Sequence, residues 1–295
     1  MKILILGKGA FGRAIYSVIA RSERDVTFWD RGADIMHADV VIIAVPTKAI
    51  REVLEFIKTD SLPIIVNCSK GIEVGTHELP YRVVRDVLGD GVSYFSLMGP
   101  SFSQEVIEKM PTLVNIGYAK TTTLEEREKM KKLFQADYFR VRLTSSIRAI
   151  ELAAAMKNVY AIACGMSKGL GFKHNTRAKL IALAIEEILI LTETLGFAMD
   201  KRALPAVIGD VVMTCSSNNS RNFAFGEMLV SRSVEESLQY VKGVVEGYAS
   251  TEPLGYLVEK TKGETPLAVL LCDILDGQKD ATEIKDRFSR FLKSS

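Results

Sequence analysis

Cysteine and histidine are scarce in this chain, which has four and three of them among 295 residues. The cysteines, Cys68, Cys164, Cys215 and Cys272, stand far apart without a CxxC pair, and the histidines show no ligand spacing. This scarcity excludes a disulfide framework and a zinc site of the usual spacing. We therefore expect reduced, mostly buried thiols and no metal site.

Neither sign of charge dominates, and no uninterrupted apolar segment reaches the length of a membrane span. Lysine and arginine number 38 against 36 acidic residues, so the formal net charge is +2. Such a balance gives no global field for nucleic acid or an anionic membrane, and anion binding must be local. The chain begins directly with strand residues and without a signal-peptide pattern. We expect a cytoplasmic protein that neither binds nucleic acid nor inserts into a membrane.

The sequence does contain a glycine-rich turn between a short apolar run and a helical pattern. Residues 2–6 are typical of a buried parallel strand, and residues 13–20 carry apolar residues at helical spacing. Between them, Gly7, Gly9 and Gly12 form the GxGxxG pattern of dinucleotide-binding folds. These glycines would permit a tight turn, close approach of a pyrophosphate and close packing of helix on strand. A turn that merely happens to be glycine-rich is the alternative.

An acidic residue follows the next predicted strand, about twenty residues beyond the glycines. That strand, residues 25–29, is followed by Asp30 and Arg31. A carboxylate at this place binds the ribose hydroxyls of NAD, whereas the neighbouring guanidinium could hold the 2′-phosphate of NADP. Asp30 favours NAD, but both cofactors stay open. The alternative that these two residues are only an exposed charged pair at the end of a strand also stays open.

Strands and helices alternate up to about residue 146, and helical periodicity continues from there to the end of the chain. The alternation predicts a Rossmann-like, mostly parallel sheet whose ligand cleft lies at the carboxyl ends of the strands. The sequence therefore predicts an α/β fold with a dinucleotide-binding domain at 1–146 and an all-helical substrate domain at 147–295. We expect the two domains to meet in one cleft, and Asn175 to cap the second long helix.

A lysine interrupts the first long helix, which is otherwise apolar nearly all round. An unpaired ammonium is expensive to bury. Lys157 therefore either extends to a wet edge or donates a proton to a substrate oxygen. Glu151 and Asn158 are seven residues apart and share a face of this helix. We expect them to anchor the helix and not to react.

Polar residues gather before a later helix, where Asp210 is followed by Ser220, Arg221 and Asn222. A guanidinium fork, directional donors and a helix start together suit a phosphate. A plain polar loop is the alternative. Lys70 and the GPSF motif at 99–102 follow the fourth and fifth predicted strands, at the edge that faces the ligand in such sheets.

In combination, these features resemble the bacterial type of NAD(P)-dependent glycerol-3-phosphate dehydrogenase over essentially the whole chain. The matching motifs are GxGxxG, AVP at 44–46, SKG at 69–71, GPSF at 99–102, ELAAAMKNV at 151–159, NTR at 175–177, GDxxxTC at 209–215, SRN at 220–222 and VVEG at 244–247. The resemblance implies reduction of dihydroxyacetone phosphate to sn-glycerol 3-phosphate by NADH or NADPH. That step supplies phospholipid synthesis.

The resemblance also implies a role for each matched residue. Lys157 would be the catalytic general acid, and the base in the reverse direction. The phosphorylated triose would contact Lys70, Gly99, Ser101, Lys157, Asp210, Ser220, Arg221 and Asn222. The cofactor residues would be Gly7, Gly9, Ala10, Phe11, Gly12, Asp30, Arg31, Lys70, Ser103, Arg221, Val244 and Glu246, where Asp30 is the acid after the second predicted strand. Arg221 and Asn222 would hold the phosphate.

The chain departs from the family pattern between the second strand and the AVP motif, where only residues 32–38 replace a much longer segment. This removes part of the expected adenosine-side wall. Two rival classes are a ketopantoate or β-hydroxyacid reductase, which would not need residues 220–222, and a catalytically silent NAD(P)-binding regulator. Lys157, Lys70 and Asp210 together favour the enzyme. The sequence leaves the cofactor preference and the oligomeric state open, with a homodimer as the assembly to test.

Overall fold

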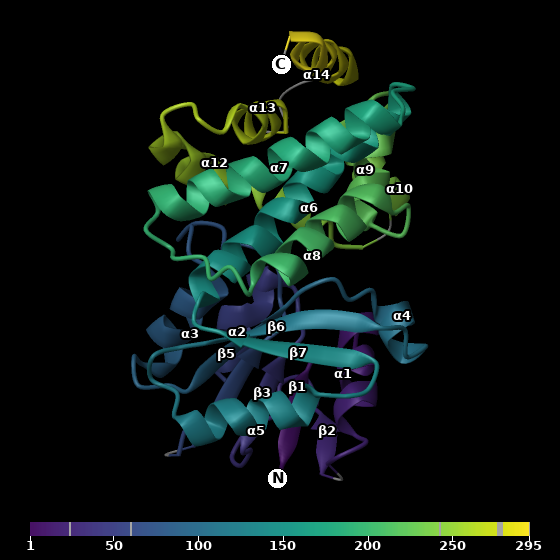
Figure 1. The fold of residues 1–295 in the computed structure, drawn as a ribbon. Coiled ribbons are helices and arrows are strands. Elements are labelled where there is room, and N and C mark those ends of the chain that lie inside the picture. Colours follow the sequence, from purple (N-terminus) through teal and green to yellow (C-terminus); the bar gives the residue numbers. More distant parts are fainter. Residues whose placement is uncertain (24, 60, 242, 276–279, 295) are drawn as a thin grey trace. The chain divides into compact units, whose positions relative to one another are not determined.

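The chain folds into two compact units, shown in the computed structural model of Figure 1. The described residues are 1–23, 25–59, 61–241, 243–275 and 280–294. The first unit comprises Met1–Lys70, Glu78–Glu151 and Met199–Val207, and the second comprises Gly71–His77, Leu152–Ala198 and Ile208–Ser295. Each unit is thus assembled from separated stretches of chain. A boundary between residues 146 and 147 stays a prediction.

A seven-stranded sheet forms the centre of the first unit within the described residues, in the order β2-β1-β3-β4-β5-β6-β7. Its strands are β1 (Ile3–Leu6), β2 (Val26–Phe28), β3 (Val40–Ile43), β4 (Ile64–Asn67), β5 (Tyr94–Met98), β6 (Thr112–Tyr118) and β7 (Phe139–Thr144). Neighbouring strands are parallel except β5 and β6, which are antiparallel. The predicted mostly parallel, Rossmann-like sheet is confirmed.

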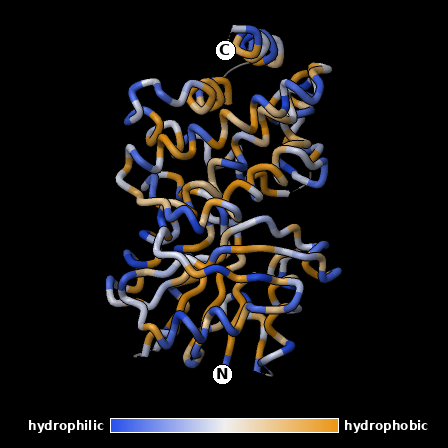
Figure 2. Tube along the Cα trace, viewed as in Figure 1, coloured by the Kyte–Doolittle hydropathy of each residue, from blue (hydrophilic) through white to orange (hydrophobic). Residues whose placement is uncertain are grey.

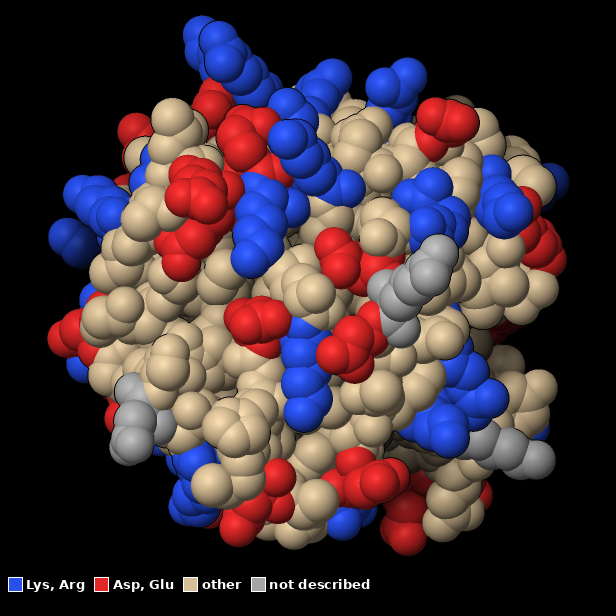
Figure 3. Space-filling model, turned by 90° about the horizontal axis from the view of Figure 1, so that it is seen from below, with Lys and Arg blue, Asp and Glu red and all other residues tan. Residues whose placement is uncertain are grey.

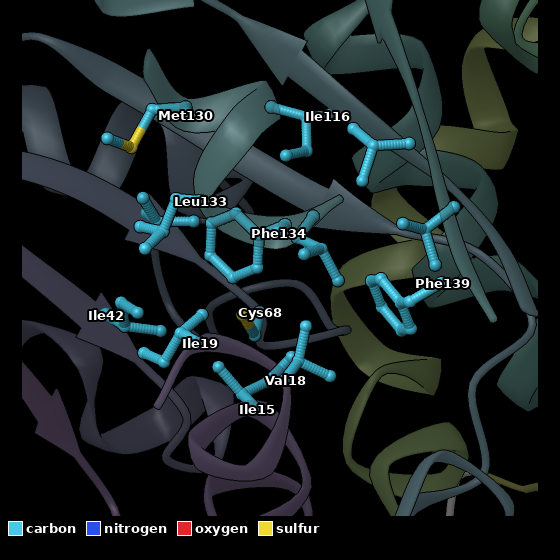
Figure 4. Packing of buried hydrophobic residues seen from close by; sticks show 14 of the residues in the cluster. Ile15, Val18, Ile19, Ile42, Cys68, Ile116, Met130, Leu133, Phe134 and Phe139 are labelled. Atoms are coloured by element: carbon cyan, nitrogen blue, oxygen red, sulfur yellow. The ribbon is translucent and has the colours of Figure 1, made fainter. Parts of the chain in front are cut away.

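Helices cover both faces of this sheet because its buried strands carry apolar side chains on both sides. They are α1 (Ala10–Ile19), η1 (Thr47–Ala49), α2 (Ile50–Leu54), α3 (Pro80–Leu88), α4 (Ser103–Ile107) and α5 (Leu124–Phe134). Val40 and Ile42 of β3 belong to the apolar cluster with α1 and α5, which Figure 4 shows from close by. Val41 and Ile43 belong to the cluster with α2 and α3. The alternation along β3 is the two-residue period of a strand.

The described part of the second unit contains helices and no strand. Its elements are α6 (Ile147–Gly169), which starts in the first unit, α7 (His174–Thr194), α8 (Leu204–Ser216), α9 (Arg221–Leu229), α10 (Val234–Val241), α11 (Glu246–Ala249), α12 (Thr251–Val258), η2 (Glu259–Thr261), α13 (Pro266–Ile274) and α14 (Ala281–Ser294). Figure 2 shows hydrophobic and hydrophilic residues mixed along α14. Its buried residues Ile284, Phe288 and Leu292 recur every four positions, so one face of the helix packs inward. The predicted all-helical region is confirmed.

The N-cap predicted for the second long helix is wrong. Lys173 occupies the N-cap position of α7, and Asn175 lies in the first turn. The reason is that the backbone N–H of Arg177 already donates to the carbonyl of Lys173, so the helix begins two residues earlier than the sequence indicates.

The thiols are shielded from solvent. Cys68, Cys164 and Cys215 are buried, and Cys272 is half-buried. Burial raises the pKa of Cys68 and of Cys272 to about 12, which leaves both thiols protonated and unreactive near neutral pH. The predicted burial of the cysteines is confirmed. Among the described residues, no group of three or more potential ligands is arranged to hold a metal ion.

Charges of both signs are interspersed on the face shown in Figure 3, which is consistent with the small net charge. Of the described helices, none combines the length and apolar content that crossing a membrane requires.

Helices α6 and α9 touch backbone to backbone through glycines. A Cβ atom added at Gly226 of α9 would lie 2.0 Å from the carbonyl oxygen of Ile162, and one at Gly165 of α6 would lie 2.0 Å from that of Phe223. Real Cβ atoms are excluded from such distances, so neither position accepts a side chain without separating the helices. The start of α9 is therefore fixed against α6.

We expect Gly226→Ala to lower the free energy of unfolding by roughly 3 kcal/mol, because the added methyl group forces the two backbones apart. Gly255→Ala in α12 is the matched control, since its Cβ would lie 3.7 Å from the Cβ of Cys272, an ordinary contact. There, alanine should stabilise the helix by about 1 kcal/mol. Urea unfolding of both variants checks the prediction, and equal stabilities would contradict it.

Candidate functional site

The glycine turn of the first unit has the geometry of a pyrophosphate cradle. Gly7 has φ of +114°, and a Cβ there would lie 2.5 Å from the carbonyl oxygen of Ala44. A Cβ at Gly12 would lie 1.9 Å from the carbonyl oxygen of Gly7. The absence of a side chain at Gly12 therefore lets α1 pack directly against the turn. The space beside Gly9 is open to 4 Å, and Gly9 is the N-cap of α1. The first N–H groups of the helix, from Ala10 on, are therefore offered to an anion.

Asp30 and Arg31 lie exposed in a turn directly after β2. The N–H of Ala33 donates to the carbonyl of Asp30 at 3.0 Å, which closes the turn. Arg31 lies 3.5 Å from Glu52, with the two side chains 85% and 58% exposed. An ion pair this exposed is weak, so the guanidinium is available to a ligand.

The short connection from β2 to β3 is fastened to the first unit. The N–H of Ile35 donates to the carbonyl of Phe56 at 2.7 Å, and the N–H of Lys58 donates to the carbonyl of Ile35 at 3.0 Å. Trp29 adds a bond from Nε1 to the carbonyl of Ala33 at 2.7 Å. The connection thus pairs with residues 56–58, which follow α2.

Lys70, Gly99 and Ser101 are brought together at the ends of β4 and β5. The Nζ of Lys70 donates to the carbonyl of Gly99 at 2.8 Å, and the hydroxyl of Ser101 donates to the same carbonyl at 3.0 Å. Ser103 begins α4 and is half-buried. The expected polar cluster at the carboxyl edge of the sheet is present, and one carbonyl oxygen organises it.

Lys157 is 5% exposed and paired in the second unit. Its Nζ lies 2.5 Å from Oδ1 of Asp210 and 2.8 Å from Oγ1 of Thr214. Of the two alternatives that the sequence left open, the one in which the Lys157 side chain extends to solvent is therefore wrong. A buried ammonium needs such compensation, since its charge is costly to remove from water.

Thr214 is the site residue that sequence reasoning missed. Its hydroxyl donates to the backbone carbonyl of Asp210 at 2.6 Å, so the hydroxyl oxygen accepts from Lys157. Asp210 and Thr214 are four residues apart on α8 and share a face. That spacing, visible in the GDxxxTC motif, is the signal that could have identified it.

Asn222 links three helices. Its Nδ2 donates to Oδ1 of Asn158 on α6 at 3.0 Å, and its Oδ1 accepts the N–H of Gly247 on α11 at 2.9 Å. The Oγ of Ser220 accepts the N–H of Phe223 at 3.3 Å and so caps α9. The predicted anchoring by Asn158 is visible in these contacts.

Arg221 is exposed at the first position of α9. It lies against the segment before α11, since a Cβ added at Gly243 would be 2.9 Å from its Nη1. Val244 and Glu246 follow in that segment and are half-buried. Thus the SRN and VVEG motifs, about twenty residues apart in sequence, are neighbours in space.

Glu151 is 1% exposed in the first unit and anchors the start of α6. It accepts the hydroxyl of Tyr94 at 2.6 Å and the N–H of Tyr81 at 2.9 Å. Burial raises the pKa of Glu151, and these hydrogen bonds oppose that shift.

Two family models match the chain, described as the NAD-dependent glycerol-3-phosphate dehydrogenase N-terminus over residues 33–124 and C-terminus over residues 146–286. The glycerol-3-phosphate dehydrogenase [NAD(P)+] of Staphylococcus aureus (strain USA300 / TCH1516) is 30% identical, with 99% of both chains covered. The chain belongs to the NAD-dependent glycerol-3-phosphate dehydrogenase family. The family resemblance read from the motifs is confirmed.

Solved structures agree with this family. The glycerol-3-phosphate dehydrogenase of Coxiella burnetii has a TM-score of 0.87 at 27% identity, with 99% of this chain and 98% of that chain covered. A 2-dehydropantoate 2-reductase of Geobacter metallireducens GS-15 has a TM-score of 0.60 at 14% identity, with 95% and 100% covered. The latter similarity shows a shared fold alone.

The Staphylococcus aureus enzyme carries residues that have no counterpart in this chain. The alignment with the Staphylococcus aureus enzyme extends over 336 positions, more than the 295 residues present here. The short connection at residues 32–38 is one place where we expect the difference to fall.

We expect Asp210→Leu and Lys157→Met each to lower the free energy of unfolding by about 3–5 kcal/mol, because each leaves one buried charge without its partner. The double variant should be more stable than the sum of these losses predicts. Arg82 and Asp86, 3.0 Å apart on the exposed side of α3, provide the matched surface pair. Their coupling in urea unfolding should stay below about 1 kcal/mol. Additive losses at Lys157 and Asp210 would contradict the prediction.

Proposed function

We propose that the chain reduces dihydroxyacetone phosphate to sn-glycerol 3-phosphate with NADH or NADPH, and catalyses the reverse oxidation. The observation that carries this proposal is the buried Lys157, held by Asp210 and Thr214 at 2.5 and 2.8 Å. Membership of the dehydrogenase family and the glycine cradle of the first unit support it. The reaction needs a proton for the carbonyl oxygen, and Lys157 can supply one.

Lys157 acts as the general acid. A bound nicotinamide cofactor would supply the hydride, and negative charge would develop on the carbonyl oxygen of the substrate. The ammonium of Lys157 neutralises this charge by donating its proton. Asp210 compensates the ammonium in surroundings where water is nearly excluded, and Thr214 orients it. In the oxidation direction, the amine of Lys157 takes the proton back.

Arg221 and its neighbours hold the phosphate of the substrate. A guanidinium presents two parallel N–H donors that match phosphate oxygens. Ser220 accepts the N–H of Phe223 and keeps its own hydroxyl proton to donate. The Nδ2 of Asn222 has a second N–H beyond the one donated to Asn158. Lys70, Gly99 and Ser101 would contact the substrate from the first unit.

The cofactor residues follow from the cradle and the family motifs. Gly7, Gly9 and Gly12 shape the turn, and the N–H groups at the start of α1 would hold the pyrophosphate. Asp30 would bind the ribose hydroxyls of NAD. The further contacts proposed are Ala10, Phe11, Arg31, Lys70, Ser103, Arg221, Val244 and Glu246.

Supply of glycerol phosphate to phospholipid synthesis, action in the cytoplasm and assembly as a homodimer stay predictions.

The purified chain should oxidise NADH or NADPH when dihydroxyacetone phosphate is added and not when ketopantoate is added. Lys157→Ala should lower kcat by about 10²- to 10⁴-fold, because the proton donor is lost. Arg221→Ala should mainly raise KM for the triose phosphate, by about 10- to 100-fold, through loss of a charged hydrogen-bond donor. Lys168→Ala, further along α6, is the control. No turnover with either cofactor, or small and equal effects of both variants, would refute the assignment.

Asp30 should favour binding of NADH, and Arg31 should favour binding of NADPH. We expect Asp30→Ala to raise KM for NADH about tenfold, because ribose hydrogen bonds to a charged group are lost. Arg31→Ala should raise KM for NADPH more than KM for NADH, because only NADPH carries the 2′-phosphate. Asp34→Ala, an exposed acid in the same connection, is the control. Steady-state kinetics with both cofactors check this, and identical shifts in the two KM values would contradict it.

A further inference from the structure

The segment directly after Lys70 belongs to the helical unit, although the strand before it and the helix after it belong to the sheet unit. Gly71–His77 is part of the second unit, whereas residues up to Lys70 and from Glu78 onward are part of the first. Lys70 is therefore the last residue before the chain changes units. Contacts that hold residues 71–77 in place therefore also restrict the backbone conformations available to Lys70.

The segment closes on itself within a few residues. The hydroxyl of Thr76 donates to Oε2 of Glu73 at 2.6 Å, and the N–H of His77 donates to the carbonyl of Glu73 at 3.0 Å. Gly71, Ile72 and Glu73 are buried. Only two buried residues thus separate Lys70 from a compact turn, which leaves little slack between them.

His77 fastens this turn to α12. Its Nε2 lies 3.0 Å from Oε1 of Glu252, and its ring centroid lies 4.5 Å from that of Tyr256 at an interplanar angle of 31°. Glu252 and Tyr256 are four residues apart on α12, so they present one surface to the imidazole. Lys260 in turn places its ammonium 4.8 Å from the Tyr256 ring.

The backbone at His77 is held in an unfavourable conformation. Its φ is +59°, in the left-handed region that residues other than glycine adopt rarely and at a cost. Such a conformation persists only where surrounding contacts fix it. The N–H bond to the carbonyl of Glu73 and the side-chain contacts with Glu252 and Tyr256 hold it here.

We propose that His77 is a positioning residue for Lys70. By holding residues 71–77 against α12, His77 limits the conformations of the backbone that follows Lys70, whose amine donates to the carbonyl of Gly99. This inference rests on the proposed function, in which Lys70 contacts the triose phosphate. In the proposed function Lys70 contacts the substrate and Lys157 transfers the proton, so loss of the position of Lys70 should appear mainly in KM for the substrate.

His77→Asn is the decisive variant, because asparagine tolerates the left-handed backbone but is too short to replace the imidazole contacts. We expect KM for dihydroxyacetone phosphate to rise about fivefold, the effect of losing one partly exposed hydrogen bond and one ring contact. The value of kcat should change less than twofold, and KM for NADH should rise less than KM for dihydroxyacetone phosphate, since Lys70 is only one of many proposed cofactor contacts. Amide hydrogen exchange of the full chain should become faster in residues 71–77. His174→Asn, at an exposed histidine of the same unit, is the matched control.

Tyr256→Leu and Glu252→Gln test the same contact from α12 and leave the backbone at His77 unaltered. Both should raise KM for dihydroxyacetone phosphate in the same direction as His77→Asn. An unchanged KM, an equal rise in KM for NADH, or unchanged exchange in residues 71–77 would overturn the inference. If the parent chain does not turn over dihydroxyacetone phosphate, the proposed function fails. The exchange measurement then still decides whether His77 holds the segment.

Discussion

A lysine ammonium can remain almost out of contact with water in the helical unit because Asp210 and Thr214 compensate it at 2.5 and 2.8 Å. Without a partner this buried ammonium would cost about 3–5 kcal/mol, a large part of a domain's margin of stability, so the acid and the hydroxyl are a condition for a charged lysine here. Their own placement depends on α8, where a four-residue spacing puts both on one face. The proposed chemistry uses this same group, whose exclusion from water strengthens its interaction with developing negative charge.

The helices that carry the site are held at short distances by glycines and by one amide. Gly165 and Gly226 let the backbones of α6 and α9 touch, and Asn222 connects α9 to Asn158 and Gly247. These contacts bring Arg221 to the first position of a helix fixed against the one that bears Lys157. In the proposed function, this placement of the proton donor and of the phosphate-binding arginine orients a small substrate for reaction.

Sequence reasoning predicted most of the architecture because the periodicities are strong. The continuous apolar run of β3 and the apolar character of α6 follow from burial on all sides, and these patterns are legible in a single chain. The antiparallel pairing of β5 with β6 was not legible, since strand direction depends on the path of the connection between them. The start of α7 was predicted two residues too late, because the N–H of Arg177 donates to the carbonyl of Lys173 and the helix already includes Asn175. Thr214 had no assigned role because its significance lies in a contact 57 residues away in sequence.

The amino-acid sequence by itself determined the alternation of elements, the glycine turn, the family and the residue types available for chemistry. These depend on local spacing and on motifs that stay together along the chain. Only the tertiary structure decided that Lys157 is paired and not extended to water, that Asn222 joins three helices, and that the segment after Lys70 belongs to the helical unit. Each of those outcomes depends on contacts between residues distant in sequence, and no local pattern encodes which partners packing will bring within hydrogen-bond distance.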